Sequence, residues 1–387
     1  MNELKAFRSA EFDWTRQLKS VWHDPPYHLP SLHQQQLEDL IEYFERKTRD
    51  PNPPDEPLGR VIVAPAGYGK THLIGELRRR VWAMNGWFIL LDFIGIKDFW
   101  SSVALNFLNS LQVRMKDRQT QYNRLFRELA SRLGIHREMM AIIEGCQGQS
   151  DKLIKELVQL FIRSLAGKYG DEANQHQGVV TALILLISED FDCHNVAHAW
   201  LQGIPPDADF AQRLNLQQIN SPIKVVEGLC WLMSLVGPTV IAVDQIDAIV
   251  NAQNSLSYQE GSGAHDEQQR AQFIVGQLAQ GLMDLHEKKR RAVTVVSCLE
   301  ATWKVLNDLA LVPVSDRFLV PPYRSAFWVR AKSLATSSLH GCSRPIRLAI
   351  SSHPIGHGLS ANRHSRPQLT GHHANSLRRA KLTANAA

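Results

Sequence analysis

Eight consecutive residues behind an apolar run have the types and spacing of a phosphate-binding loop. They follow residues 61–63 and read Ala64, Pro65, Ala66, Gly67, Tyr68, Gly69, Lys70 and Thr71. A loop that binds a polyphosphate presents successive backbone N–H groups, so it needs residues without bulky side chains. In the pattern G-x-x-x-x-G-K-[ST], the lysine reaches the β- and γ-phosphates and the hydroxyl takes a position on Mg²⁺. The sequence therefore predicts such a site here, with His72 beside it in the helix that follows.

The first position of this loop departs from the pattern, because Ala64 stands where glycine is expected. Alanine still lets the backbone turn, so we expect a modified site rather than a lost one. The alternative is a chance Gly-Lys-Thr sequence in a surface turn. The apolar run before the loop and the amphipathic stretch 71–81 after it favour a strand, a loop and a helix.

A second stretch supplies an acidic residue of the kind that holds Mg²⁺. Residues 240–243 are apolar and predict a buried strand, and Asp244 follows at its carboxyl end, where ligands gather in open α/β sheets. We expect Asp244 to bind Mg²⁺ directly or through water. The next residue is Gln245, whose amide can orient water but cannot accept its proton as a carboxylate does. Hydrolysis is therefore expected to be slow, with Asp247 as a substitute base or as a brace for the loop.

Two further residues are expected to act near the γ-phosphate. The apolar run 292–296 ends at Ser297, which either senses that phosphate or caps the helix expected at 299–306. Arg317 follows a turn-like segment, and its guanidinium could stabilise the charge of a transferred phosphoryl group. It would do so in its own site or across a subunit interface.

Taken in order, these motifs resemble the AAA+/STAND branch of P-loop ATPases. The stretch 64–73 is similar to the phosphate loop of STAND signalling ATPases, and 316–323 resembles the origin-recognition initiator ATPases. The resemblance covers residues 30–323 and implies a three-layer α/β P-loop NTPase fold with a parallel sheet. It also implies ATP and Mg²⁺ as cofactors and a homo-oligomer. Its site residues would be Lys70 and Thr71 on phosphate and metal, Asp244 on Mg²⁺, Ser297 as sensor and Arg317 as arginine finger. The sequence lacks the Asn-Lys-x-Asp element that marks guanine, which favours ATP.

The hydrophobic pattern predicts the elements that position these residues. A helix at 31–47 with Ser31 as N-cap, then a proline-rich linker at 49–57, give an N-terminal helical arm over residues 1–57. Residues 58–323 would form the ATPase domain, in which the apolar run 87–93 is another strand of the parallel sheet. Between residues 98 and 236 the spacing of apolar residues is largely helical. Helices are expected at 99–113, 122–133, 152–166, 179–188 and 225–235.

This helical region is too long for one crossover between strands, so we expect a helical insertion at about 115–222. It would pack beside the nucleotide domain and bind a protein partner, or it would only enlarge the core. Within it, Cys193, His194 and His198 are close enough in sequence to suggest metal ligands. No further ligands follow at a zinc-like spacing, which favours ordinary, partly buried histidines.

The last part of the chain is basic and has no acidic residue after Asp316. Residues 318–387 carry ten Lys and Arg, although the whole chain has 43 of them against 38 Asp and Glu. A basic arm of this kind neutralises phosphates on DNA, with a steep salt dependence. The alternative is a disordered tail, or a terminus altered by a reading-frame accident. We expect the segment 324–387 to be disordered.

Composition limits the remaining classes of protein. Hydrophobic residues make up 44% of 387 residues, enough for a sizeable core. The five cysteines are scattered and odd in number, which predicts a reducing, cytoplasmic compartment without a disulfide framework. The longest aliphatic stretch, 179–187, is too short to span a bilayer, so no membrane association is expected.

Three functions follow from these observations. The first is an ATP-dependent conformational switch with slow hydrolysis. The second is a DNA-binding AAA+-type ATPase that acts as an initiator, loader or regulator, with affinity supplied by the basic tail. The third is a nucleotide-binding scaffold that does not hydrolyse ATP. A small-molecule kinase is disfavoured, because the sequence shows no separate motif for an acceptor.

Overall fold

The computed structural model describes most of the chain between residues 21 and 319. The described residues are 21–24, 33–50, 57–93, 98–146, 149–188, 190–205, 209, 212, 216, 221–248, 264–309 and 317–319. Most of the proline-rich linker, residues 320–323 and the basic segment 324–387 lie outside these ranges. The expectations made for them stay predictions.

A parallel β-sheet lies at the centre of the described part of the chain. Its five strands run in the order β2-β3-β4-β1-β5, and every neighbouring pair is parallel. The strands are β1 (Gly59–Val63), β2 (Trp87–Asp92), β3 (Thr239–Asp244), β4 (Ala292–Cys298) and β5 (Phe318–Leu319). Because all strands point the same way, their carboxyl ends meet at one edge of the sheet. This confirms the expected α/β fold with a parallel sheet.

Alternate residues of each strand enter different hydrophobic clusters on the two faces of the sheet. In β3, Ile241 and Val243 belong to one cluster, whereas Val240 and Ala242 belong to the other. Both faces are therefore covered by apolar side chains, as expected for buried parallel strands. The helices α2 (Gln34–Thr48) and α3 (Lys70–Ala83) pack on the face of Val240.

The opposite face packs against four helices. These helices are α4 (Phe99–Gln112), α12 (Pro222–Val236), α14 (Ala264–Lys288) and α15 (Glu300–Leu309). The strand end of β1 leads into the loop before α3, so the predicted strand–loop–helix unit at residues 61–81 is confirmed.

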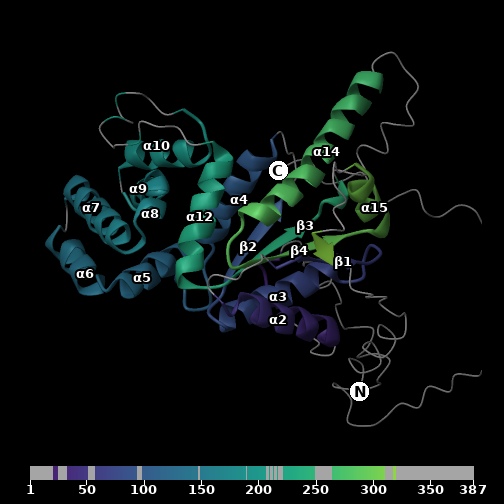
Figure 1. Cartoon of the computed structure of the whole chain (residues 1–387), viewed down its shortest axis with the longest axis horizontal. Helices are drawn as coiled ribbons and strands as arrows, with labels where there is room; N and C mark the ends of the chain where they lie inside the picture. The colour runs from purple at the N-terminus through teal and green to yellow at the C-terminus, as the bar shows by residue number, and fades with distance from the viewer. Residues whose placement is uncertain are drawn as a thin grey trace, which may run out of the picture. The chain divides into compact units, whose positions relative to one another are not determined.

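The helical region between α4 and α12 extends sideways from this layer (Figure 1). It contains α5 (Gln121–Leu133), α6 (His136–Gly145), α7 (Ser150–Tyr169), α8 (Asp171–Gln175), α9 (Gln177–Leu185) and α10 (Phe191–Leu201). Buried residues of α5, α7 and α9 belong to the same hydrophobic cluster as Ile241 of the sheet. The extension therefore shares a continuous core with the sheet.

Polar side chains cover the outer edge of β2, where a strand would otherwise expose its backbone. Gln121 accepts a hydrogen bond from Phe88 N at 3.0 Å and donates to Phe88 O at 2.9 Å. Ser110 Oγ accepts from Leu90 N at 3.0 Å, and Asn106 donates to the carbonyl oxygen of Asp92 at 2.8 Å. Side chains of α4 and α5 thus replace a neighbouring strand, since buried backbone groups must find partners.

One local expectation differs from the structure, and one helix was not expected. Helix α2 begins at Gln34 and its N-cap is His33, in the left-handed region at φ 59°, without a side-chain cap. The prediction of Ser31 as N-cap is therefore wrong, because the chain enters this helix two residues later. Helix α14, which reaches β4, was not expected from the sequence.

Among the described residues, no helix is both long and apolar enough to cross a membrane.

Candidate functional site

The predicted phosphate loop lies between β1 and α3, at the carboxyl edge of the sheet. Gly67 and Gly69 have φ values of 77° and 79°, in the left-handed region that favours glycine. Gly69 is also the N-cap residue of α3, so the loop ends at the positive end of the helix dipole. Ala64 N donates to the carbonyl oxygen of Cys298 at 3.2 Å, which fixes the start of the loop to β4. Loops that end at a helix N-terminus bind anions in other proteins, and the anion site of this loop stays a prediction.

Lys70 folds back against its own loop. Its Nζ donates to the carbonyl oxygens of Ala64 at 2.8 Å and Pro65 at 3.3 Å, and lies 4.0 Å from Asp247 Oδ2. The side chain is only 11% exposed. The ammonium charge is therefore held at the loop, within reach of an anion bound there.

Two side chains from separate elements meet at Asp244. Thr71 Oγ1, in the first turn of α3, donates to Asp244 Oδ2 at 2.9 Å. Ser297 Oγ, on β4, donates to the other carboxylate oxygen. Asp244 and Ser297 are buried, at 4% and 0% exposure. Thr71 and Ser297, which lie 173 and 53 positions from Asp244 in the sequence, thus bond to the same carboxylate. From the sequence, all three residues were expected near the phosphates and the metal.

Asp247 braces the start of α15. Its Oδ1 accepts a hydrogen bond from Leu299 N at 2.8 Å, and Leu299 precedes the first residue of α15. This agrees with the bracing role that the sequence left open for it. Burial, reinforced by the Asp247 carboxylate, raises the pKa of the neighbouring Cys298 thiol well above its usual value, so this cysteine stays protonated.

Ser297 does not cap the helix that follows it. Its hydroxyl is bonded to Asp244, and the first N–H of that region is bonded to Asp247 instead. The capping interpretation is therefore wrong for Ser297, since the strand ends one residue later, at Cys298, and turns the serine inward. Its role as a sensor stays a prediction.

Arg317 lies at the opposite edge of the sheet from the loop. Its carbonyl oxygen accepts from Gly59 N at 2.8 Å, and the next residue, Phe318, pairs with Gly59 at the amino end of β1. Its guanidinium lies 3.8 Å from Glu287 near the end of α14. Ala64, the first residue of the loop, lies five residues beyond Gly59 along the strand, at roughly 16 Å. An arginine finger acting in its own site is therefore contradicted, because β5 pairs at the amino end; a role across a subunit interface stays a prediction.

His72 points along its own helix rather than into the loop. Its Nε2 lies 3.6 Å from Glu76 Oε1, one turn further along α3. On the outer side of the loop, His33 Nε2 lies 2.8 Å from the carbonyl oxygen of Tyr68. Burial lowers the pKa of His33, so this ring is neutral at pH 7. Helix α2 is thereby connected to the phosphate loop.

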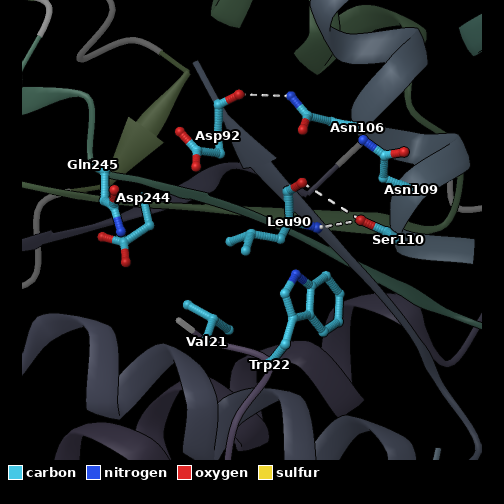
Figure 2. A pocket seen from close by; sticks show the side chains of 9 residues that line it. All are labelled: Val21, Trp22, Leu90, Asp92, Asn106, Asn109, Ser110, Asp244 and Gln245. Atoms are coloured by element: carbon cyan, nitrogen blue, oxygen red, sulfur yellow. Dashed lines mark hydrogen bonds between the residues drawn. The ribbon is translucent and has the colours of Figure 1, made fainter. Parts of the chain in front are cut away.

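Gln245 follows Asp244 in the left-handed region, at φ 64°, and its side chain is exposed. It lines an open cavity of about 190 Å³ between the ends of β2 and β3, helix α4 and residues 21–22. Figure 2 shows this cavity with Asp92, Asn106 and Asn109 on the side of β2 and α4.

Sequence reasoning missed Asp92. It interrupts the apolar run 87–93 as Asp244 ends its own run, and this shared strand-ending carboxylate was the available signal.

His194 and His198 lie side by side on α10 of the helical extension. Within the described ranges, no group of three or more His, Cys, Asp or Glu could hold a metal ion. His194 and His198 stack with ring centroids 6.2 Å apart, and His198 Nδ1 lies 2.7 Å from Gln202 Nε2. These contacts agree with ordinary, partly buried histidines.

The side chains at Asp244 suit a Mg²⁺ ion that is bound together with a substrate. Mg²⁺ prefers oxygen ligands and is usually held by one or two carboxylates together with substrate phosphates and water, not by an all-protein cage. Asp244 and Thr71 supply a carboxylate and a hydroxyl beside the phosphate loop. The donor set therefore fits a metal that arrives with a polyphosphate.

Comparison of the chain with protein-family models, with curated proteins and with solved structures gives no match.

Proposed function

We propose that this chain binds ATP with Mg²⁺ and hydrolyses it slowly, as a nucleotide-dependent conformational switch of the P-loop ATPase class. The hydrogen bond from Thr71 to Asp244 carries this proposal, because it joins the end of the phosphate loop to the acidic end of β3. A Gly-Lys-Thr turn that occurs by chance is not expected to contact a buried carboxylate 173 residues away.

In this proposal, the loop and Lys70 bind the phosphates. The N–H groups that follow Gly67 and the dipole of α3 attract the anion, and Lys70 exchanges its bonds to Ala64 and Pro65 for bonds to phosphate oxygens. Thr71 and Asp244 would hold Mg²⁺. The metal, when bound, neutralises charge that develops on the phosphates.

Slow turnover follows from Gln245. A carboxylate at this position would take the proton of the attacking water, whereas an amide can only orient that water.

The switch itself would arise at Ser297. This hydroxyl is bonded to the carboxylate that would hold the metal, so loss of the γ-phosphate changes its surroundings directly. A ligand shifts an equilibrium between two conformations only through such differential contacts. In other switch proteins, loops become ordered around a bound γ-phosphate and are released when it is hydrolysed.

The test is nucleotide affinity and phosphate release for the intact chain and two variants, Lys70→Ala and Gln245→Glu. Lys70→Ala should abolish ATP binding, because the ammonium group that would bind the phosphate oxygens is lost. Gln245→Glu should bind ATP and release phosphate faster. Lys155→Ala, which removes an exposed lysine of α7, is the control and should match the intact chain.

ATP binding that survives Lys70→Ala unchanged would contradict the proposed site. Phosphate release that stays equal or falls in Gln245→Glu would contradict our explanation of slow hydrolysis. Binding without any release in the intact chain would leave the non-hydrolysing scaffold.

A second candidate function is ATP-dependent binding of DNA. It is favoured by the ten Lys and Arg in residues 324–387, a segment without Asp or Glu. DNA affinity should then fall steeply with salt, and deletion of 324–387 should remove both the affinity and its salt dependence. Unchanged affinity after the deletion would eliminate this candidate.

A further inference from the structure

The carboxyl ends of β2 and β3 carry two aspartates in direct register. Asp92 is the strand partner of Asp244, and the pairs before it run without a break from Trp87 and Thr239. Neighbouring strands lie about 4.8 Å apart, so the two residues are adjacent at the same edge of the sheet.

Both aspartates lie on the side of the sheet that faces α3. The residues before them, Leu91 and Val243, belong to the cluster on the opposite face. Because side chains alternate along a strand, Asp92 and Asp244 turn towards the face on which Thr71 lies. Figure 2 shows Asp92 and Asp244 on the wall of one cavity, with Gln245 beside Asp244.

The walls of this cavity are fixed by contacts. Asn106 donates to the backbone carbonyl oxygen of Asp92 at 2.8 Å, which holds the end of β2. On the other side, Trp22 stacks on Trp82 with centroids 6.3 Å apart and packs edge-on against Phe88. The cavity, of about 190 Å³, is large enough for several water molecules and opens beside Asp244.

Two other aspartates at this edge, Asp244 and Asp247, accept hydrogen bonds within the site. Asp244 accepts from the hydroxyls of Thr71 and Ser297, and these bonds fix it as the metal-side group. Asp247 accepts from Leu299 N and faces Lys70. Asp92 lines the cavity together with Asp244 and Gln245, on the strand next to that of Asp244.

We propose that Asp92 is the general base that the residue after Asp244 does not supply. This inference rests on the proposed function and names the residue that activates water in it. Gln245 orients a water molecule from the cavity, and the water oxygen attacks the γ-phosphorus. The bond from that phosphorus to the β,γ-bridging oxygen breaks, and its electron pair leaves with ADP. The proton of the water goes to Asp92 and then to solvent, so the products are ADP, inorganic phosphate and a proton.

The decisive variant is Asp92→Asn, which keeps the size of the side chain and removes its basicity. We expect phosphate release to fall at least tenfold, while the dissociation constant for MgATP stays within threefold of that of the intact chain. Nucleotide extracted from the protein after gel filtration should contain a larger share of ATP over ADP than nucleotide from the intact chain. Asp39→Asn, an exposed carboxylate on α2, is the control and should change none of these quantities.

Two further variants keep the test decisive if Asp92→Asn folds poorly. Asp92→Glu keeps a carboxylate and should retain more than a tenth of the phosphate release. Adding Gln245→Glu to Asp92→Asn should restore release, because position 245 then supplies the base.

Equal phosphate release in Asp92→Asn and the intact chain would overturn the inference. So would a dissociation constant more than tenfold weaker, since Asp92 would then hold the nucleotide or its metal. Hydrolysis by the intact chain that Asp92→Asn leaves unchanged overturns this inference alone, whereas MgATP binding without hydrolysis overturns both the inference and the proposed slow hydrolysis. An intact chain that binds no nucleotide overturns the proposed function.

Discussion

All strands of the sheet begin at one border, its amino edge, and end at the opposite border, its carboxyl edge. Both of these edges bury polar groups, but the groups find their hydrogen-bond partners in different ways. At the amino edge, Lys289 is 1% exposed and donates to the backbone carbonyl oxygens of Pro57 at 3.0 Å and His286 at 3.3 Å. At the carboxyl edge, Asp244 receives its bonds from the side-chain hydroxyls of Thr71 and Ser297.

This difference separates stability from binding. The carbonyl oxygens that Lys289 bonds are buried and would lose their donor if it left, whereas hydroxyls and a carboxylate can exchange partners for a metal or a phosphate. The amino edge should therefore respond to substitution through the free energy of unfolding, and the carboxyl edge through affinity.

The largest effect is expected for Lys289→Ala at the amino edge. The substitution leaves a cavity and two buried carbonyl oxygens without their donor, so we expect a loss of about 3 kcal/mol in the free energy of unfolding. Lys288→Ala is the control, because Lys288 forms a partly exposed ion pair with Glu227 at 3.0 Å and should cost less than about 1 kcal/mol. Urea denaturation measures both. Similar losses in the two variants would contradict the comparison of the edges.

At the carboxyl edge, Asp244→Asn should act on affinity. We expect MgATP to bind about 30-fold more weakly, equivalent to about 2 kcal/mol, while the free energy of unfolding without nucleotide changes by less than about 1 kcal/mol. Titration with a fluorescent ATP analogue measures the affinity. With EDTA present the two proteins should bind alike, since the difference depends on the metal. A large loss of stability with unchanged affinity would reverse the roles assigned to the two edges.

Acid should lower the free energy of unfolding through His286, which lies at the amino edge. Its pKa falls to about 4 because of burial and then the charges of Lys289 and Arg317. The unfolded chain takes up this proton below about pH 6.5, whereas the folded chain resists until about pH 4, so stability is lost as the pH falls through this window. The expected loss at pH 5 is about 1–2 kcal/mol relative to pH 7.5. In His286→Gln this part of the loss should disappear from thermal or urea unfolding curves; an unchanged pH dependence would assign it to other groups.

The smallest effects are expected in the phosphate loop. Gly67→Ala and Gly69→Ala should each cost about 1 kcal/mol, because alanine is strained at positive φ. A Cβ at Gly69 would lie 3.0 Å from His33 Nε2, whereas one at Gly67 meets nothing within 4 Å. His33→Ala should therefore relieve part of the cost of Gly69→Ala and none of the cost of Gly67→Ala. Equal relief in both double variants would show that the contact with His33 is unimportant.

Local sequence patterns predicted the elements well where one segment decides its own structure. The apolar runs 61–63, 87–93, 240–243 and 292–296 became strands, and the five helices expected in the helical region were found close to their predicted bounds. The meeting of Thr71, Asp244 and Ser297 followed from strand-ending positions, because parallel strands end at one edge.

Features that depend on pairing between distant segments were not predictable from local patterns. The position of Arg317 depends on β5, a strand of two residues whose register with β1 places it at the amino edge. Asp92 gains its meaning only from its register with Asp244. The sequence did not show that Asp247, and not Ser297, holds the start of α15. That depends on the hydrogen-bond partners that the folded chain brings to each side chain.

The covered edge of β2 has a consequence for how the molecule behaves in crowded solution. A bare strand border is a template for edge-to-edge association between molecules, and proteins that must stay dissolved at high concentration conceal it. Here the amide of Gln121 occupies the hydrogen-bonding groups of Phe88 that an incoming strand would use. One glutamine thus acts as a built-in safeguard against growth of the sheet on that side.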